Sequence, residues 1–312
     1  MKEIPSSKCY QLRIDEDIAT TCIGITDINC DDTENMIVGS WNGVIRVVNL
    51  NGTASSVQPL TGFGRLSSMC VVDSGLLVCS VDGHCTMVSC NPLQNSEQYK
   101  YRLEVVFTED VCYNSYVMQY YKRDRDYVVF GTDDGFVYIY GLQKNHLSFL
   151  GCKNVDGAIV DIAAKPESSS LVLFVSCEGS IAYEMEFVHG SLRTTEIRPK
   201  VCNRVGYEYH HTYVYPCGTG YSVQCSCEGV LKCCNIYTPS SLMHFELHKD
   251  KRLYLVDGQG NPYLIDIRDP IDDMTAFCVV DRDLLPRIVL VCRSGNYINV
   301  YTDILQYYDS HS

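Results

Sequence analysis

One short phrase recurs along this chain and constrains its fold more than any other feature. Each copy is an apolar run, then a polar residue followed by Gly, then a second apolar run with alternating character. Seven copies are present, with their glycines at Gly43, Gly83, Gly135, Gly179, Gly229, Gly260 and Gly295. Gly adopts positive φ at little steric cost, and tight hairpin turns need such backbone. Each phrase therefore predicts a β-hairpin centred on its glycine.

The spacing of these hairpins predicts how they are assembled. The six intervals between Gly43 and Gly295 average about 42 residues, which is the length of one four-stranded propeller blade. No stretch repeats its apolar residues at the 3.6-residue period of a helix. The sequence therefore predicts an all-β protein, a seven-bladed β-propeller with four-stranded antiparallel blades, in which residues 1–312 form a single domain.

Further strands are expected on either side of the hairpins. Innermost strands are predicted at Ser67–Val72, Ser115–Tyr120, Ala158–Ala163, His210–Tyr215, Leu242–Leu247 and Thr275–Val280. Outer strands are predicted at Arg102–Phe107, His146–Cys152 and Leu192–Arg198. The intervals from Gly229 to Gly260 and from Gly260 to Gly295 are short, so the blades there are expected to have short or missing outer strands.

Closure of the ring requires the two ends of the chain to share a blade. Within the N-terminal segment 1–17, residues Tyr10–Ile14 alternate well enough to add an outer strand to the last blade. Ile304–Tyr308, in the tail 303–312, competes for the same position. The sequence leaves both assignments open.

Composition excludes several classes of partner. The net charge is −13, with 46% hydrophobic and 20% charged residues, so the surface is not built to neutralise phosphates or anionic lipid. Nucleic acid and membranes are disfavoured as partners. Met1–Asp17 lacks the apolar core of a signal peptide, and runs such as Leu171–Val175 are too short to span a bilayer. We expect a cytoplasmic or nuclear protein whose 18 cysteines are mostly free thiols.

The first phrase, Ser40-Trp41-Asn42-Gly43-Val44-Ile45-Arg46-Val47, resembles the hairpin consensus of the WD-repeat propellers, and the other six resemble it in degenerate form. Within that family, Ile25–Ile28 and Cys177–Glu184 are similar to segments of the spindle-checkpoint and messenger-RNA-export propellers. The resemblance implies a non-catalytic platform that holds peptides or other subunits on a face or along the rim of the ring. The expected function is a scaffold or adaptor subunit of a multi-protein complex, with other proteins as partners.

Few residues offer catalytic or metal-binding chemistry. Cys225, Cys227, Cys233 and Cys234 form the strongest cysteine cluster, but Cys233 and Cys234 must face opposite sides of a strand, and the spacing is not that of a zinc knuckle. His244 and His248 frame the sequence HFELH, which is not the helical HExxH of a zinc protease. The sequence predicts no catalytic residue, metal or cofactor. The alternative is an enzyme or metal-dependent protein whose distant residues converge at the channel mouth.

The hairpin turns define a candidate binding site, because in a propeller they emerge on one side of the ring. Their polar residues predict an acidic annulus that consists of Asp82, Asp133, Asp134, Glu178, Glu228 and Asp257. Arg293 and His84 lie in the same turns and oppose this charge locally. Trp41 lies on the same rim as an aromatic anchor, and Tyr207 and Tyr209 are further candidate contacts. Two interpretations remain open. The acids are ordinary solvated turn residues, or they attract a basic segment of a partner.

Overall fold

The structure is a computed structural model of the 312-residue chain. It describes residues 2–5, 8–13, 18–50, 53, 55–73, 75–165, 168, 170–179, 181–198, 211–217, 220–226, 230–237, 242–256, 262–280, 286–302 and 304. Strands dominate this part of the chain, which also contains the short 3-10 helix η1 (Thr20–Cys22). No helix among these residues is long and apolar enough to cross a bilayer.

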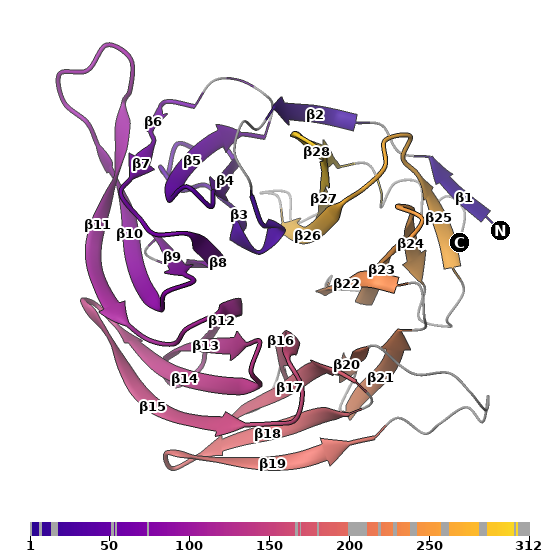
Figure 1. The fold of residues 1–312 in the computed structure, drawn as a ribbon. Helices are drawn as coiled ribbons and strands as arrows, with labels where there is room; N and C mark the ends of the chain where they lie inside the picture. Colours follow the sequence, from indigo (N-terminus) through magenta and orange to yellow (C-terminus); the bar gives the residue numbers. More distant parts are fainter. Residues whose placement is uncertain are drawn as a thin grey trace.

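The strands form six sheets set radially around a central channel, which is the architecture of a β-propeller (Figure 1). Each sheet is built on antiparallel pairs between strands consecutive along the chain, the pattern that hairpin connections produce. In each sheet, strands that follow one another along the chain by hairpin turns run outward from the channel, and strands from earlier in the chain pair at the outer edge of three sheets (Figure 1). We number the blades one to six in chain order.

The first three blades follow one another without interruption. Blade one contains β3 (Ile23–Thr26), β4 (Asn35–Gly39), β5 (Val44–Asn49) and β7 (Leu60–Thr61). Blade two contains β8 (Leu66–Val72), β9 (Gly75–Ser80), β10 (His84–Pro92) and β11 (Tyr101–Asp110), with β6 (Val57–Gln58) parallel to β11 at its outer edge. Blade three contains β12 (Ser115–Lys122), β13 (Asp126–Thr132), β14 (Phe136–Gln143) and β15 (His146–Asn154).

The last three blades are less regular. Blade four contains β16 (Ile159–Ala164), β17 (Leu171–Glu178), β18 (Ala182–Val188) and β19 (Ser191–Ile197), joined by the hairpin β20 (His211–Cys217) and β21 (Gly220–Ser226). Blade five contains β22 (Val230–Tyr237), β23 (Leu242–His248), β24 (Leu253–Val256) and β25 (Pro262–Asp266), with β1 (Lys2–Pro5) at its edge. Blade six contains β26 (Asp273–Val280), β27 (Pro286–Ser294), β28 (Tyr297–Tyr301) and β2 (Lys8–Arg13).

The core lies between the blades. Phe245 of β23 belongs to the same buried cluster as Leu290 of β27, and Ile37 of β4 to the same cluster as Leu76 of β9. A blade packed on both sides buries both faces of its second strand, which explains why β17 is a continuous apolar run rather than an alternating one. The apolar runs that open five of the repeated phrases, those around Gly43, Gly83, Gly135, Gly179 and Gly295, are these doubly buried strands.

The sequence predicts seven blades, and the structure has six. The reason lies around Gly229, which is outside the described residues. The two strands flanking it do not form the predicted hairpin: β21 pairs with β20 in the sheet of blade four, whereas β22 begins blade five. The hairpin β20–β21 stands between these blades. Cys177 of β17 pairs with Thr212 of β20, and Tyr213 packs with Cys233 of β22 on the other side.

A second correction follows in blade five. Leu242–Leu247, predicted as an innermost strand, is β23 and lies second from the channel. The phrase around Gly260 consequently joins β24 and β25, the third and fourth strands, rather than the second and third. Gly260 itself lies outside the described residues. The predicted outer strands at 102–107, 146–152 and 192–198 coincide with β11, β15 and β19.

The N-terminal segment contributes to two blades. β1 runs parallel to β25 at the edge of blade five, and β2 runs antiparallel to β28 at the edge of blade six. Figure 1 shows both strands at the outer rim, far in sequence from their neighbours. Ile304, in the C-terminal tail, is fully buried in the cluster between these two blades.

Candidate functional site

The turns between second and third strands share one face of the ring with the connections between blades. The backbone N–H of Phe63, in the connection after blade one, donates to the carbonyl of Gly43 at 3.3 Å. The N–H of Val155, in the connection after blade three, donates to the carbonyl of Gly135 at 2.9 Å. Each turn is therefore fastened to the connection that follows it. We call this surface the turn face.

Glycine is required in these turns for two reasons. Gly43 and Gly135 have φ of +71° and +84°, in the left-handed region that other residues adopt at a cost. A Cβ at Gly43 would stand 1.9 Å from the carbonyl oxygen of Phe63, and one at Gly135 would stand 2.4 Å from that of Val155. The repeated glycine thus permits both the turn and the close approach of the next connection.

Exposed carboxylates gather on the turn face over blades two to four. The predicted residues Asp82, Asp133, Asp134 and Glu178 are all exposed in the turns of these blades. Asp110, the last residue of β11, and Asp156, in the connection that follows β15, are exposed as well and were not predicted. We call the set of six, Asp82, Asp110, Asp133, Asp134, Asp156 and Glu178, the acidic arc. Carboxylates of one sign around a channel mouth produce a field that attracts cations.

His84 lies inside the acidic arc. Its Nδ1 is 2.6 Å from Oδ1 of Asp110, and its Nε2 is 3.8 Å from Oδ2 of Asp82. A hydrogen bond from Ser80 is the main cause that lowers the pKa of Asp82, with smaller contributions from its own backbone N–H and from His84. Asp82 therefore stays ionised at neutral pH, and His84 offers a single positive charge among the acids only when protonated.

Two predicted acids and two predicted tyrosines cannot be placed. Glu228, Asp257, Tyr207 and Tyr209 lie outside the described residues. The strands β24 and β25 on either side of Asp257 are the third and fourth of their blade, so the segment between them is not a turn between second and third strands. In blade five that turn joins β23 to β24.

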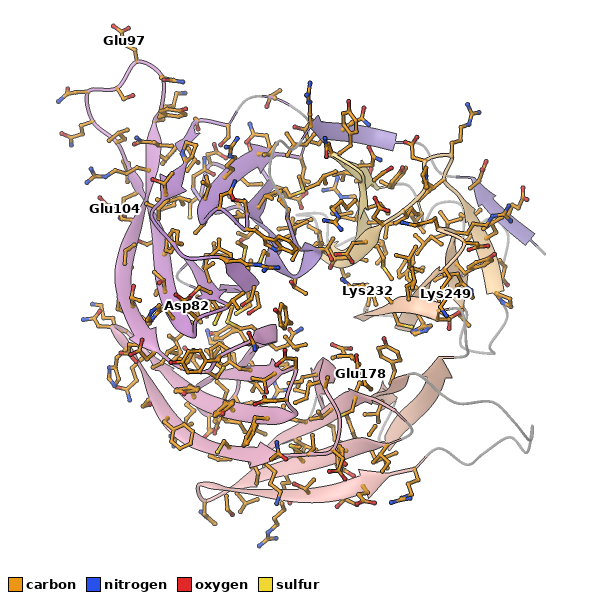
Figure 2. All side chains as sticks on the ribbon, in the orientation of Figure 1. Asp82, Glu97, Glu104, Glu178, Lys232 and Lys249 are labelled. Carbon is orange, nitrogen blue, oxygen red and sulfur yellow. The ribbon has the colours of Figure 1, made fainter. Side chains whose placement is uncertain are left out.

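The turn between β23 and β24 carries the opposite charge. Its exposed residues include Lys249, Lys251 and Arg252, accompanied by Asp250. Figure 2 shows Lys249 across the channel from Asp82. The turn face is therefore acidic over blades two to four, whereas over blade five the turn is basic, with Lys251 and Arg252 paired to Asp272 and Asp250. A partner with charge of one sign would be attracted to one side and repelled from the other.

Arg293, which was predicted to oppose the acids, forms structural contacts on the turn face of blade six. Its Nη1 donates to the carbonyl of Ile18 at 3.2 Å, which ties the β27–β28 turn to the segment before β3. Beside it, the Lys251 ammonium and then the backbone N–H of Gly295 lower the pKa of Asp272. These contacts give Arg293 and Lys251 structural partners on the face.

Trp41 lies at the turn of blade one, half-buried, under a guanidinium group. The Arg65 carbon Cζ stands 3.8 Å from the centroid of the Trp41 ring, a cation–π contact. Arg65 belongs to the connection after blade one and is exposed. A ligand that used the outer surface of Trp41 would have to displace this side chain.

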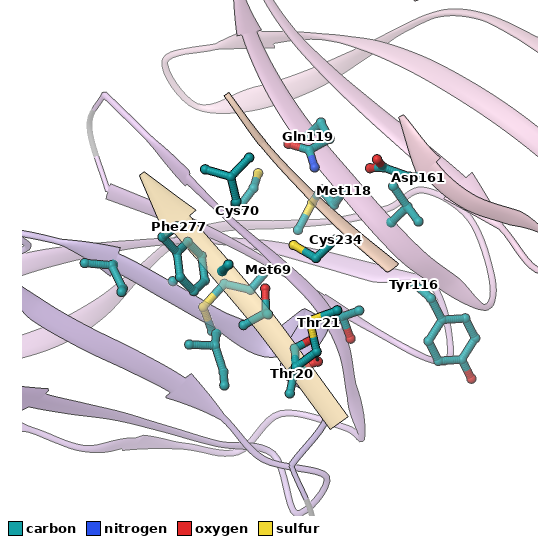
Figure 3. A pocket seen from close by; sticks show the side chains of 18 of the residues that line it. Thr20, Thr21, Met69, Cys70, Tyr116, Met118, Gln119, Asp161, Cys234 and Phe277 are labelled. Atoms are coloured by element: carbon teal, nitrogen blue, oxygen red, sulfur yellow. Dashed lines mark hydrogen bonds between the residues drawn. The ribbon is translucent and has the colours of Figure 1, made fainter. Parts of the chain in front are cut away.

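The channel forms a second candidate site, a cavity of about 500 Å³ lined by all six innermost strands (Figure 3). Lys232 donates to Oδ1 of Asp273 and to Oγ1 of Thr20, both at 2.7 Å. Burial favours the neutral form of Asp273, but the Lys232 ammonium and the Thr20 hydroxyl outweigh it and lower the pKa of this carboxyl. The charged groups thus pair across the β22–β26 boundary.

The cysteine cluster predicted from the sequence is only partly described. Cys227 and the side chain of Cys225 lie outside the described residues. Cys234 faces the channel (Figure 3), whereas Cys233, while also bordering the cavity, packs against Tyr213 of β20. Within the described ranges, one group of three metal-donor side chains converges: Cys233, His244 and Glu246. In the sequence, Cys233 belongs to the cysteine cluster and His244 to the HFELH segment, and no local pattern links the two residues.

Comparison with known proteins identifies the fold but no family. No family model matches this chain, and no curated protein matches it. Among solved structures, BBS1N in complex with ARL6DN is similar at a TM-score of 0.65 and 11% identity, covering 97% of this chain and 98% of that one. BamB from Moraxella catarrhalis is similar at a TM-score of 0.55 and 11% identity, covering 95% of this chain and 99% of that one.

These likenesses support the β-propeller fold over nearly the whole chain. At 11% identity they carry no residue of a binding site from one protein to the other. They do not place the chain among the WD-repeat propellers, nor in the checkpoint and export subgroup that two of its segments resemble.

Proposed function

We propose that this chain is a non-catalytic interaction scaffold, a subunit of a larger complex that binds a basic segment of a partner protein on its turn face. The acidic arc carries the proposal. Its six carboxylates are exposed, come from three successive blades, and surround one side of the channel mouth. The similar structure of BBS1N was solved in complex with ARL6DN, so a propeller of this fold can serve as a protein-binding module.

The charge distribution specifies the kind of partner. Lysine and arginine side chains would be drawn to Asp133 and Glu178, while Lys249 across the channel would repel them (Figure 2). A segment with basic residues at one end and neutral or acidic residues at the other fits this polarity. Such complementarity sets orientation and association rate more than total affinity.

A charge-reversal experiment tests the proposal. The double variant Asp133→Lys, Glu178→Lys is compared with wild type for binding of octalysine by calorimetry in about 50 mM salt, where screening is weak. Exposed ion pairs contribute about 0.2–1 kcal/mol each, and reversal replaces attraction with repulsion of similar size. Two reversals should therefore weaken binding by about 0.8–4 kcal/mol, which is about fourfold to several hundredfold, and the difference should shrink in higher salt.

The matched control is Glu97→Lys, Glu196→Lys, which changes the net charge equally. Glu97 is exposed in the loop between β10 and β11, and Glu196 is exposed on the outermost strand β19 (Figure 2 labels Glu97). This variant should bind octalysine nearly as well as wild type. Equal losses of octalysine affinity in the two variants would show that binding follows net charge alone and that the turn face is not the binding site.

A further inference from the structure

Strand register brings three metal-donor side chains together in blade five. Cys233 of β22 is directly opposite Glu246 of β23 in their antiparallel pair. Residues paired in this way project from the same face of a sheet, and so do residues two apart along one strand. His244 therefore shares that face with Glu246 and Cys233. The donor atoms of all three lie within 4.8 Å of one another.

The group is enclosed between blade five and the hairpin β20–β21. Cys233 and His244 are 9% and 3% exposed, and Tyr213 of β20 is 3% exposed. The Tyr213 ring lies against the His244 ring at a centroid distance of 6.1 Å, and its side chain hydrogen-bonds with Cys233. Cys233 also borders the central cavity, so one side of the group is open to the channel.

The spacing of the donors suits tetrahedral coordination. Zn²⁺ bonds of about 2.0–2.2 Å to nitrogen and oxygen place two ligand atoms of a tetrahedron about 3.3–3.5 Å apart. Nε2 of His244 and Oε1 of Glu246 are 3.3 Å apart. The sulfur of Cys233 lies within 4.8 Å of both atoms, so the thiolate would supply the third ligand.

The chemistry of the donors points to zinc. Thiolate sulfur and imidazole nitrogen are ligands that Zn²⁺ prefers, and a carboxylate is a regular third partner. A thiolate and a carboxylate together carry two negative charges, which one divalent cation neutralises, and buried charges are otherwise costly. On the far side of Glu246, Nε2 of His248 lies 3.1 Å from Oε2 and would hold the carboxylate in place.

We propose that Cys233, His244 and Glu246 bind one Zn²⁺ ion, with a water molecule from the central cavity in the fourth position. His248 acts as a positioning residue for Glu246. The inference is independent of the turn face. The competing account is a metal-free hydrogen-bonded network in which Glu246 is simply held between His244 and His248.

The test uses the full chain, stripped of metal with a chelator under reducing conditions, dialysed, and then titrated with Zn²⁺ alone. Mass spectrometry of the metal content should find one zinc per chain in wild type. Cys233→Ser and Glu246→Gln should each weaken zinc binding by at least tenfold. Cys234→Ser is the matched control, because the neighbouring residue on a strand projects from the opposite face, and it should keep one zinc.

Two further measurements on wild type keep the test decisive even where a variant fails to fold. Cobalt(II) in place of zinc should give a thiolate charge-transfer band and the visible bands of a tetrahedral site. Cys233 and Cys234 both border the central cavity, so a small alkylating reagent can reach them slowly in the metal-free chain, and zinc should slow the alkylation of Cys233 but not that of Cys234, as read by peptide mass spectrometry. The proposal is overturned if wild type takes up no stoichiometric zinc, if the cobalt complex lacks the thiolate band, or if zinc binding is the same in Cys233→Ser and Glu246→Gln as in wild type.

Discussion

Comparing alanine substitutions at two turn glycines tests whether the turns are packed against the connections between blades. Gly43 and Gly179 both have positive φ, +71° and +92°, so alanine at either position pays about 1–2 kcal/mol for the left-handed backbone. At Gly179 a Cβ would meet no atom within 4 Å, whereas at Gly43 it would stand 1.9 Å from the Phe63 carbonyl oxygen. Displacing that connection loses a hydrogen bond, about 1 kcal/mol, and adds overpacking of about 1–3 kcal/mol.

We therefore expect Gly43→Ala to cost about 3–6 kcal/mol and Gly179→Ala about 1–2 kcal/mol. For a chain of this size each kcal/mol lowers the melting temperature by about 2 °C, so the expected losses are about 6–12 °C and 2–4 °C. Thermal unfolding followed by circular dichroism measures both. Equal losses, or a larger loss for Gly179→Ala, would refute the claim that turns and connections are packed together on this face.

Two more predictions concern thiols and acid stability. Iodoacetamide should modify the exposed Cys30 and Cys152 in the native protein and leave Cys79 and Cys292 unmodified. Burial raises the pKa of the Cys79 and Cys292 thiols and blocks access of the reagent. Modification of Cys292 at the rate of Cys152 would contradict the packing. Asp273 has a lowered pKa, so its ion pair stabilises the fold at neutral pH and that stability is lost as the pH falls through the lowered pKa, below about 4. In urea unfolding, Asp273→Asn should be less stable than wild type at pH 7 and should lose less of its unfolding free energy between about pH 5 and 2. Parallel plots of unfolding free energy against pH for the two proteins would show that the ion pair contributes nothing.

The positions of the hairpin turns could be predicted from the sequence because a turn depends on adjacent residues. Gly43, Gly83, Gly135, Gly179 and Gly295 all have positive φ and lie between the second and third strands of their blades. A β-hairpin is determined by a few adjacent residues, and the apolar runs on either side of these glycines are long enough to identify its strands. The all-β propeller follows from this pattern.

The number of blades could not be predicted from the sequence, because it depends on pairing between strands that are distant along the chain. β21 and β22 flank a glycine as the other hairpin strands do, yet they belong to different sheets. β20 instead pairs with β17, more than thirty residues earlier in the chain. Strand patterning specifies which residues are buried, but not which neighbour covers them, so the phrase alone could not distinguish a hairpin from the boundary of two blades.

The same limit applies to the candidate sites. The acids of the turns were predictable from the phrases, but the basic turn at Lys249 required the strand order of blade five. For the metal-donor group a usable signal was present: on a strand, His244, Glu246 and His248 alternate and share one face. HFELH differs from the helical HExxH motif, but a strand does not need that spacing to place its side chains on one face. Cys233 became their neighbour only when the β22–β23 register was known.

Carboxyl footprinting tests the central claim, that the turn face is the binding surface, most directly. Exposed Asp and Glu side chains are coupled to an amine with carbodiimide, with and without octalysine, and each site is quantified by mass spectrometry. The account predicts protection at Asp82, Asp133 and Glu178, with Glu97 and Glu196 modified equally in both conditions. Protection confined to the outer strands, or spread evenly over all exposed carboxyls, would contradict it.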